Sequence, residues 1–174
     1  AAEYPVRFEV VLKGEGFVTE RIPVTIVKDQ LQQLTSVKVM KIVTPPAGAA
    51  GSNTSTPLVG GATSAPINIA TPVTNGTSQP LAVTLPTGTK FIDATGKVIE
   101  GASLAASVMN FDASKPEALE FFPGGSLVSD NVVVGTETVS ATFLPAGFAN
   151  IEMFVSGTQV KRFSQPIALS MGIS

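Results

Sequence analysis

Side chains with carboxylate or amide oxygens gather in the turns of this chain, and they are its best candidates for chemistry. The set comprises Asp93, Asn110, Asp112, Glu117, Asp130 and Asn131. Calcium takes oxygen ligands of this kind from loops, so Asp93, Asp112 and Asp130 are candidate calcium ligands. The D-x-D-x-D spacing of a calcium loop is absent, however, and a single carboxylate in a turn commonly hydrogen-bonds nearby backbone. We therefore favour a structural role for these carboxylates, with a calcium site as the alternative.

Two residue types that carry much of enzyme chemistry are missing, because the chain has no cysteine and no histidine. Disulfides, thiol nucleophiles, imidazole bases and the usual zinc ligands are thereby removed. A pair of carboxylates can still hydrolyse a glycoside, and the chain has 13 acidic residues. Aromatic platforms for sugars are nevertheless scarce, with one Tyr and no Trp. Ser114 and Lys115 are adjacent, so their side chains diverge and do not form a catalytic pair. We expect a protein that is not an enzyme and has no cofactor.

Phe121 and Phe122 are adjacent aromatic residues and the candidates for a binding site. An exposed pair of this kind can anchor a partner. Large aromatic side chains more often cover a core, and we favour that role here.

Charge and composition narrow the class of protein further. The 174 residues carry a net charge of −2, and the 11 Lys and Arg residues are scattered, so we expect no nucleic-acid partner. No apolar run approaches the roughly 18 residues that a membrane-spanning helix needs. A hydrophobic content of 44% with 16 Gly and 13 Pro, and many Thr and Val residues, is typical of an all-β secreted protein. We expect an extracellular or cell-surface location, and we interpret the chain as a piece of a longer or processed precursor.

The first 44 residues predict strands. Residues Tyr4 to Leu12 alternate apolar and polar side chains, as a half-buried strand does. A second strand is expected over Phe17 to Val27, and Pro23 places it at an edge or a bulge because proline cannot donate to a ladder. A third strand is expected over Ser36 to Val43.

Residues Thr44 to Ala65 differ from the rest because they carry no charge and almost no large apolar side chain. A segment of this composition buries too little surface to offset the entropy of ordering it. We predict a linker or long loop over residues 45–66, and an ordered segment packed on a sheet is the alternative. The predicted organisation is N-terminal strands over 1–44, finishing one module or contributing to a composite sandwich, and a β-sandwich domain over 67–174.

The remaining residues predict short strands at a spacing of 8 to 12 residues, about twelve in the whole chain, which indicates an immunoglobulin-like β-sandwich. One short helix is expected near residues 115–122. Asp112 or Ser114 would cap it, and Pro116 suits its first turn. Turns at Asn75-Gly76, Gly135-Thr136 and Ser156-Gly157-Thr158 are expected to close hairpins.

Two parts of the chain resemble known families. DATGKVIEGASL (residues 93–104) and GEGFVTERIPVTI (residues 14–26) resemble strand-and-turn patterns of carboxypeptidase-regulatory-like, transthyretin-like modules. FDASKPEALEFFPGG (111–125), LPAGFANIEMFV (144–155) and FSQPIALSM (163–171) are similar to a segment of cartilage intermediate layer proteins and their bacterial surface relatives. The resemblance implies an extracellular, non-enzymatic β module, and it carries no site residues with it.

These observations together predict a structural or adhesive module of a larger surface protein, with other surface proteins or glycans as partners. A glycan- or protein-binding module that uses the loops of residues 110–125 is one alternative. A pilus or fibre subunit that assembles by strand addition at a sheet edge is another.

Overall fold

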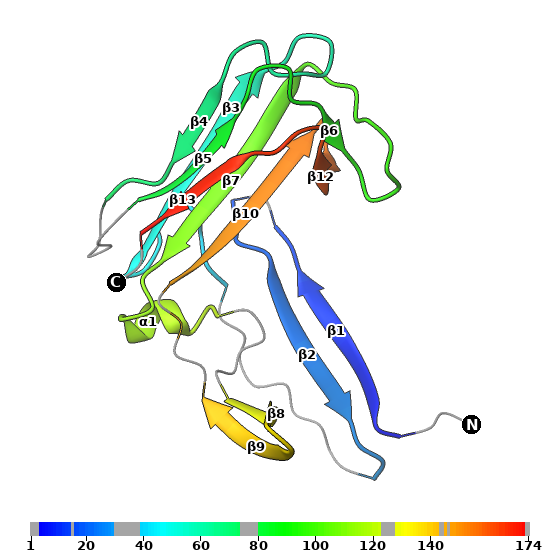
Figure 1. Ribbon diagram of the computed structural model, residues 1–174, viewed down its shortest axis with the longest axis vertical. Helices are drawn as coiled ribbons and strands as arrows, with labels where there is room; N and C mark the ends of the chain where they lie inside the picture. The colour runs from blue at the N-terminus through cyan, green and yellow to red at the C-terminus, as the bar shows by residue number, and fades with distance from the viewer. Residues whose placement is uncertain are drawn as a thin grey trace.

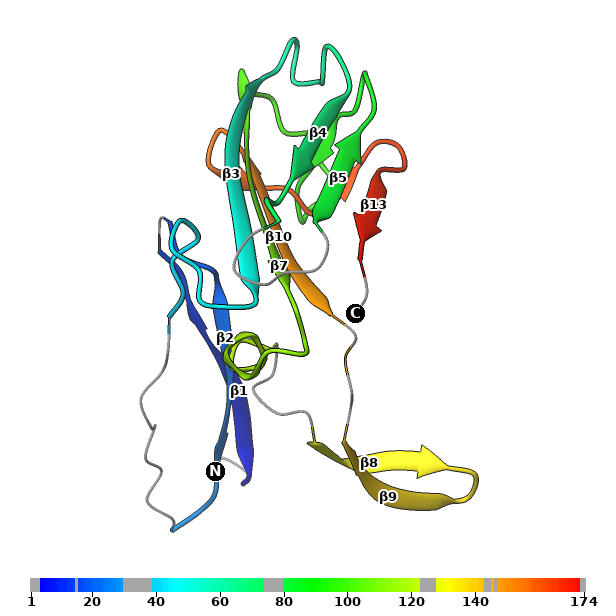
Figure 2. The ribbon, with the colours of Figure 1, turned by 90° about the vertical axis from the view of Figure 1, so that its left-hand side faces the viewer.

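The computed structural model describes residues 4–14, 16–29, 39–73, 80–122, 128–142, 145 and 147–172. Two antiparallel sheets pack face to face in a sandwich (Figures 1 and 2). One sheet has the order β11 (Thr158–Gln159), β10 (Phe148–Val155), β7 (Ser103–Phe111), β3 (Ala49–Pro57). The other has the order β13 (Ala168–Met171), β5 (Leu81–Leu85), β4 (Ile67–Ala70). A short pair, β6 (Phe91–Ile92) with β12 (Arg162–Phe163), completes the sandwich, so the predicted all-β fold is confirmed.

The main core lies between the two sheets. Leu81, Val83 and Leu85 alternate along β5 with no exposed surface, and they face alternate residues of β7 and β10. Phe91 of β6 is also fully buried, and its ring meets that of Phe163 edge-to-face at a centroid distance of 6.2 Å. Period-two burial on these strands is what the alternating sequence predicts.

A second core covers the outer face of the four-stranded sheet near the C-terminal end of β7. Met109 and Phe111 project from this face and pack against residues from outside the sandwich, namely Val18, Met40, Ile42 and, in the helix α1 (Pro116–Leu119), Ala118. Both faces of β7 are therefore buried from Val108 to Phe111, and the alternation of exposure ends there.

The prediction of a linker or loop over residues 45–66 is wrong for its central part. Ala49–Pro57 forms β3, which pairs with β7 over its whole length. Small side chains are what this position requires, because the loop at Ile42 crosses directly over the strand. A Cβ atom added to Gly51 would lie 2.7 Å from the Ile42 carbonyl oxygen and would also meet the sulfur of Met109. The segment is therefore ordered, as the alternative held, but as a strand within the sheet and not packed on it.

The short helix is present, although its predicted cap is not. α1 spans Pro116–Leu119 with Pro116 in its first turn, as expected, and Lys115 is the N-cap without a side-chain hydrogen bond. The carboxylate of Asp112 instead accepts the backbone N–H of Ser114, one turn earlier. Within the described residues, no helix has the length and apolar character needed to cross a membrane.

Two hairpins extend from the end of the sandwich that carries α1 (Figures 1 and 2). The N-terminal arm consists of β1 (Val6–Leu12) and β2 (Glu20–Ile26), with Pro23 in a two-stranded ribbon where both strands are edges. The central arm consists of β8 (Val128–Val134) and β9 (Glu137–Thr142), joined at the predicted turn. Residues 39–43, the described part of the predicted third strand, form an isolated bridge between Phe17 and Lys41 and no strand. Residues 36–38 lie outside the described part, as do residues 74–79 with the Asn75-Gly76 turn.

Candidate functional site

A groove of about 670 Å³ lies on the outer face of the four-stranded sheet, beside the second core. Its floor is formed by small side chains that project from the middle of two adjacent strands, Asn53 and Ser55 on β3 and Ala105 and Ser107 on β7. The groove exists because these residues are small and because the second core covers only one end of this face.

Aromatic rings and two charges form the walls of the groove. Phe17 comes from the loop that joins β1 and β2 in the N-terminal arm, where its N–H donates to the Gly14 carbonyl at 3.1 Å. The Lys41 ammonium lies 5.9 Å from the centroid of the Phe17 ring. Phe154 and Glu152 come from β10, and Lys13 comes from the loop that joins β1 and β2. An apolar hollow with a few polar groups of both charges suits a ligand or side chain that has an apolar body and polar substituents.

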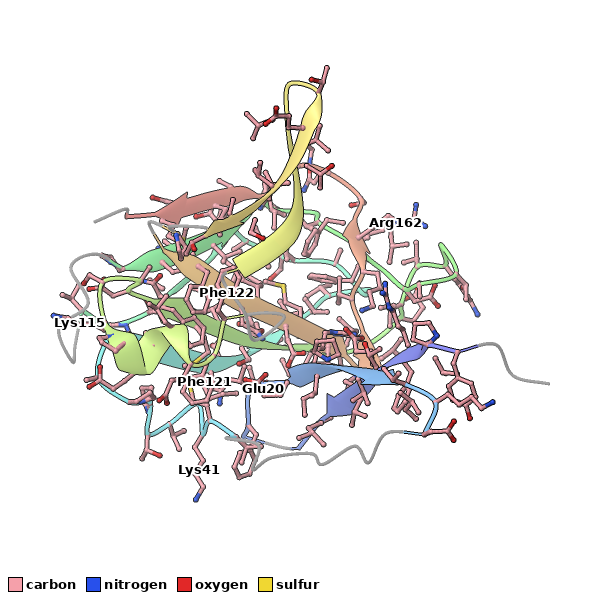
Figure 3. All side chains as sticks on the ribbon, turned by 90° about the horizontal axis from the view of Figure 1, so that it is seen from below. Glu20, Lys41, Lys115, Phe121, Phe122 and Arg162 are labelled. Carbon is pink, nitrogen blue, oxygen red and sulfur yellow. The ribbon has the colours of Figure 1, made fainter. Side chains whose placement is uncertain are left out.

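A smaller cavity of about 340 Å³ lies between the start of β2 and the N-terminal half of β10. Glu20 and Glu152 both line it, together with aromatic residues that include Phe121. Glu20 and Phe121 are labelled in Figure 3. Burial raises the pKa of Glu20, and a hydrogen bond with the Arg21 backbone opposes that rise. Sequence reasoning did not single out Glu20 or Glu152, because each appears as an ordinary polar residue of an alternating strand.

The calcium candidate Asp93 is used by its own turn. Its Oδ1 atom accepts hydrogen bonds from the Thr95 hydroxyl at 2.7 Å, the Thr95 N–H at 2.8 Å and the Lys97 N–H at 3.0 Å. The Thr95 hydroxyl, followed by the backbone donors, holds the pKa of Asp93 below its usual value. Gly96 completes this turn with a φ of +90°, which a glycine adopts without strain.

The other two calcium candidates lie elsewhere. Asp112 follows β7 beside α1, at the end of the sandwich away from Asp93 (Figure 1), and hydrogen bonding to the Ser114 hydroxyl lowers its pKa. Asp130 lies in β8, and its side chain is outside the described part. In the described ranges, no group of three or more acidic side chains is placed to hold a metal ion. The structure therefore does not bring Asp93 and Asp112 together, and calcium binding stays a prediction.

We expect Asp93 to make stability depend on acid. Because the folded pKa is lowered, the stabilisation from this carboxylate is present above the ordinary value of 3.8 and is lost as the pH falls through the folded pKa. The midpoint of thermal unfolding of D93N should therefore fall less than that of the wild type on acidification from pH 5 toward pH 2. T95V, which lacks the donating hydroxyl, should lie between the two, and parallel pH profiles for all three proteins would contradict the assignment.

The aromatic candidates belong to a cluster at the second core. Phe121 is half-buried and packs against that core, and Phe122 meets Phe148 edge-to-face at 5.4 Å (Figure 3). Phe148 in turn stacks on Phe111 with a centroid distance of 4.5 Å. Phe121 thus covers the core, which is the role we favoured, whereas Phe122 contacts the Phe148 ring beside it. Partner binding through either ring stays a prediction.

Comparison with known proteins gave no match to a family model, to a curated protein or to a solved structure. The resemblance to transthyretin-like modules and to cartilage intermediate layer proteins is not tested by this result and stays a prediction.

Proposed function

We propose that this chain is a non-catalytic β-sandwich module with a structural or adhesive role, part of a larger protein at a cell surface or in an extracellular matrix. The observation that carries the proposal is the pair of arms, which extend from a well-packed sandwich and present apolar side chains to solvent. Other surface proteins or glycans are the proposed partners.

The central arm offers an apolar tip. Val133 is 70% exposed and Val134 is 62% exposed, although neighbours on a strand project to opposite faces. Neither face of the tip therefore packs against the sandwich. Exposed aliphatic residues on both faces of a projecting hairpin are suited to insertion into a partner.

The N-terminal arm offers a broader apolar face. The register pairs Val6 with Ile26, Phe8 with Val24 and Val10 with Ile22, so these six residues share one side of the ribbon. Phe8 is 46% exposed, and no side chain of either strand is fully buried. Glu9 and Arg21 form an exposed ion pair on the opposite side, which adds little stability. A lone two-stranded ribbon is at best marginally stable in water, so a partner would stabilise this arm.

Binding of the 174-residue chain to intact cells or matrix of the source organism tests the proposal. The double variant V133S/V134S should lose most of its binding, because it removes the apolar tip while leaving the backbone pairing of the hairpin unchanged. V59S is the matched control, since Val59 is also 70% exposed but lies in a loop of the sandwich. Binding of V133S/V134S equal to that of V59S and the wild type would contradict the role of the arm.

The surface location is tested separately with antibodies raised against the sandwich. Labelling of intact cells or of extracellular matrix is the expected result. Labelling that requires lysis would overturn the proposed location without bearing on whether the arms bind a partner.

A further inference from the structure

Among the residues that the structure describes, nothing pairs with the backbone groups on the outer edge of β3 over the middle of the strand. The Leu58 N–H donates to the Ala102 carbonyl, and the Asp112 N–H donates to the Gly48 carbonyl. Together with the register, these two bonds show that the even-numbered residues of β3 direct their backbone N–H and C=O groups toward β7. The odd-numbered residues therefore direct their N–H and C=O groups away from the sheet. In the described part of the chain, no backbone partner is present for these groups at Gly51, Asn53 and Ser55.

Both ends of this free edge are closed. The Ala49 N–H already donates to the Pro46 carbonyl at 3.1 Å, and Pro57 has no N–H. The open window therefore runs from Gly51 to Ser55 and is centred on Asn53. Its centre is also exposed, as both Asn53 and Ser55 are.

Between its two closed ends, β3 also lacks the devices that protect edge strands from pairing. It is nine residues long and carries no charge, whereas the edges of the facing sheet, β4 and β13, have four residues each. The opposite edge of its own sheet is partly covered by β11 and carries the Glu152 carboxylate. Natural proteins normally interrupt such an edge with lysine, proline or a bulge, and an uninterrupted one is a template for another strand.

We propose that this edge pairs with the same edge of a second copy of the chain, antiparallel and about a two-fold axis at Asn53. In this register Gly51 faces Ser55 of the other copy, and the two Asn53 residues face each other. Each copy contributes three N–H donors and three carbonyl acceptors, and every one finds a partner. Ala49 then faces Pro57, so the two positions that have no free donor coincide.

The side chains along the joint favour the same partner. Gly51, Asn53 and Ser55 are small and uncharged on the outer face, and Ser52, Thr54 and Thr56 are small and uncharged on the inner face. The side chains of β3 therefore bring neither like charges nor bulk to the interface, where the Ile42 loop lies over Gly51 on the outer face. Facing Ser and Thr pairs contribute favourably. The result is one continuous sheet across the dimer, with the two grooves on the same side of it. The dimer does not depend on the adhesive role proposed above.

Sedimentation equilibrium tests the dimer. Protein concentrations from about 1 µM to about 1 mM are needed, because an interface of this size implies weak association. We expect reversible dimerisation, and amide exchange at Gly51, Asn53 and Ser55 that slows as concentration rises. N53P should raise the dissociation constant at least about tenfold, because it removes the two central donors and no bond to β7. N53A keeps the backbone donor and should still dimerise.

A second variant tests the same contact in case N53P does not fold. N53K places two ammonium groups opposite each other across the axis and should abolish the dimer, whereas T158K, a lysine on the far edge of the same sheet, should not. A monomer over the whole concentration range would overturn the proposal. A dimer that persists in both N53P and N53K would overturn it too, because the contact would then lie elsewhere.

Discussion

Replacing Phe91 with Ala is expected to lower the free energy of unfolding by about 3–5 kcal/mol. Phe91 has no exposed surface and lies in the main core, which the two sheets enclose. Truncation removes the buried ring and leaves a cavity that cannot collapse easily, because the flanking strands are held by their ladders. The edge-to-face contact with Phe163 is lost as well. Denaturant unfolding followed by circular dichroism measures the change, and a loss of this size is a large part of the stability of a typical domain.

The matched control for this prediction is F8A. F8A is the same substitution of Phe by Ala, but it is made on the N-terminal arm, where the Phe8 side chain is 46% exposed. A loss below about 1 kcal/mol is expected there, because less apolar surface returns to water. Equal losses in F91A and F8A would mean that the arm is as well covered as the core, and would remove the basis of the proposed adhesive surface.

Strands with large alternating side chains were predictable from sequence. Leu81, Val83 and Leu85 alternate with smaller or polar residues, and the structure buries these three alone on β5. The hairpins β8–β9 and β10–β11 follow from their turn residues, and the short helix follows from Pro116. In each case the signal is local, since the side-chain period or the turn chemistry lies within about ten residues.

β3 was not predictable in this way, because the reason for its order lies far away in sequence. Its residues have little apolar surface of their own, and composition alone indicates a linker. Pairing with β7 satisfies the backbone groups of its even-numbered residues, and the Ile42 loop packs on it only because Gly51 has no side chain. A small residue that permits close approach carries the same sequence signature as a flexible one.

The features of the candidate site also differ in whether they follow from local sequence. The turn role of Asp93 was predictable, because its donors are the next few residues of the chain. The groove was not, because its floor comes from β3 and β7 and its walls come from β10 and the turn at Phe17. Its defining feature is the absence of large side chains, which gives no signal until the strands are in register.

Replacing Phe111 with Ala is the second change of large expected effect, again about 3–5 kcal/mol. Phe111 is 2% exposed and stacks on Phe148 at the centre of the second core. This core attaches the chain around Val18 and Ile42 to the outer face of the sheet. Truncation should therefore loosen that attachment before it affects the main core, because the two clusters share no buried residue.

Native-state amide exchange separates this effect from general destabilisation. The Val18 N–H donates to the Met40 carbonyl and the Ile42 N–H donates to the Gly16 carbonyl, each at 2.9 Å. Both amides should exchange faster in F111A by a larger factor than the Val83 amide of the main core, since local opening needs only the second core to fail. F154A is the control, because Phe154 lies on the same face of the sheet but outside that core. If F111A left the Val18 and Ile42 amides as protected as F154A does, the second core would not be what joins the N-terminal arm to the sandwich.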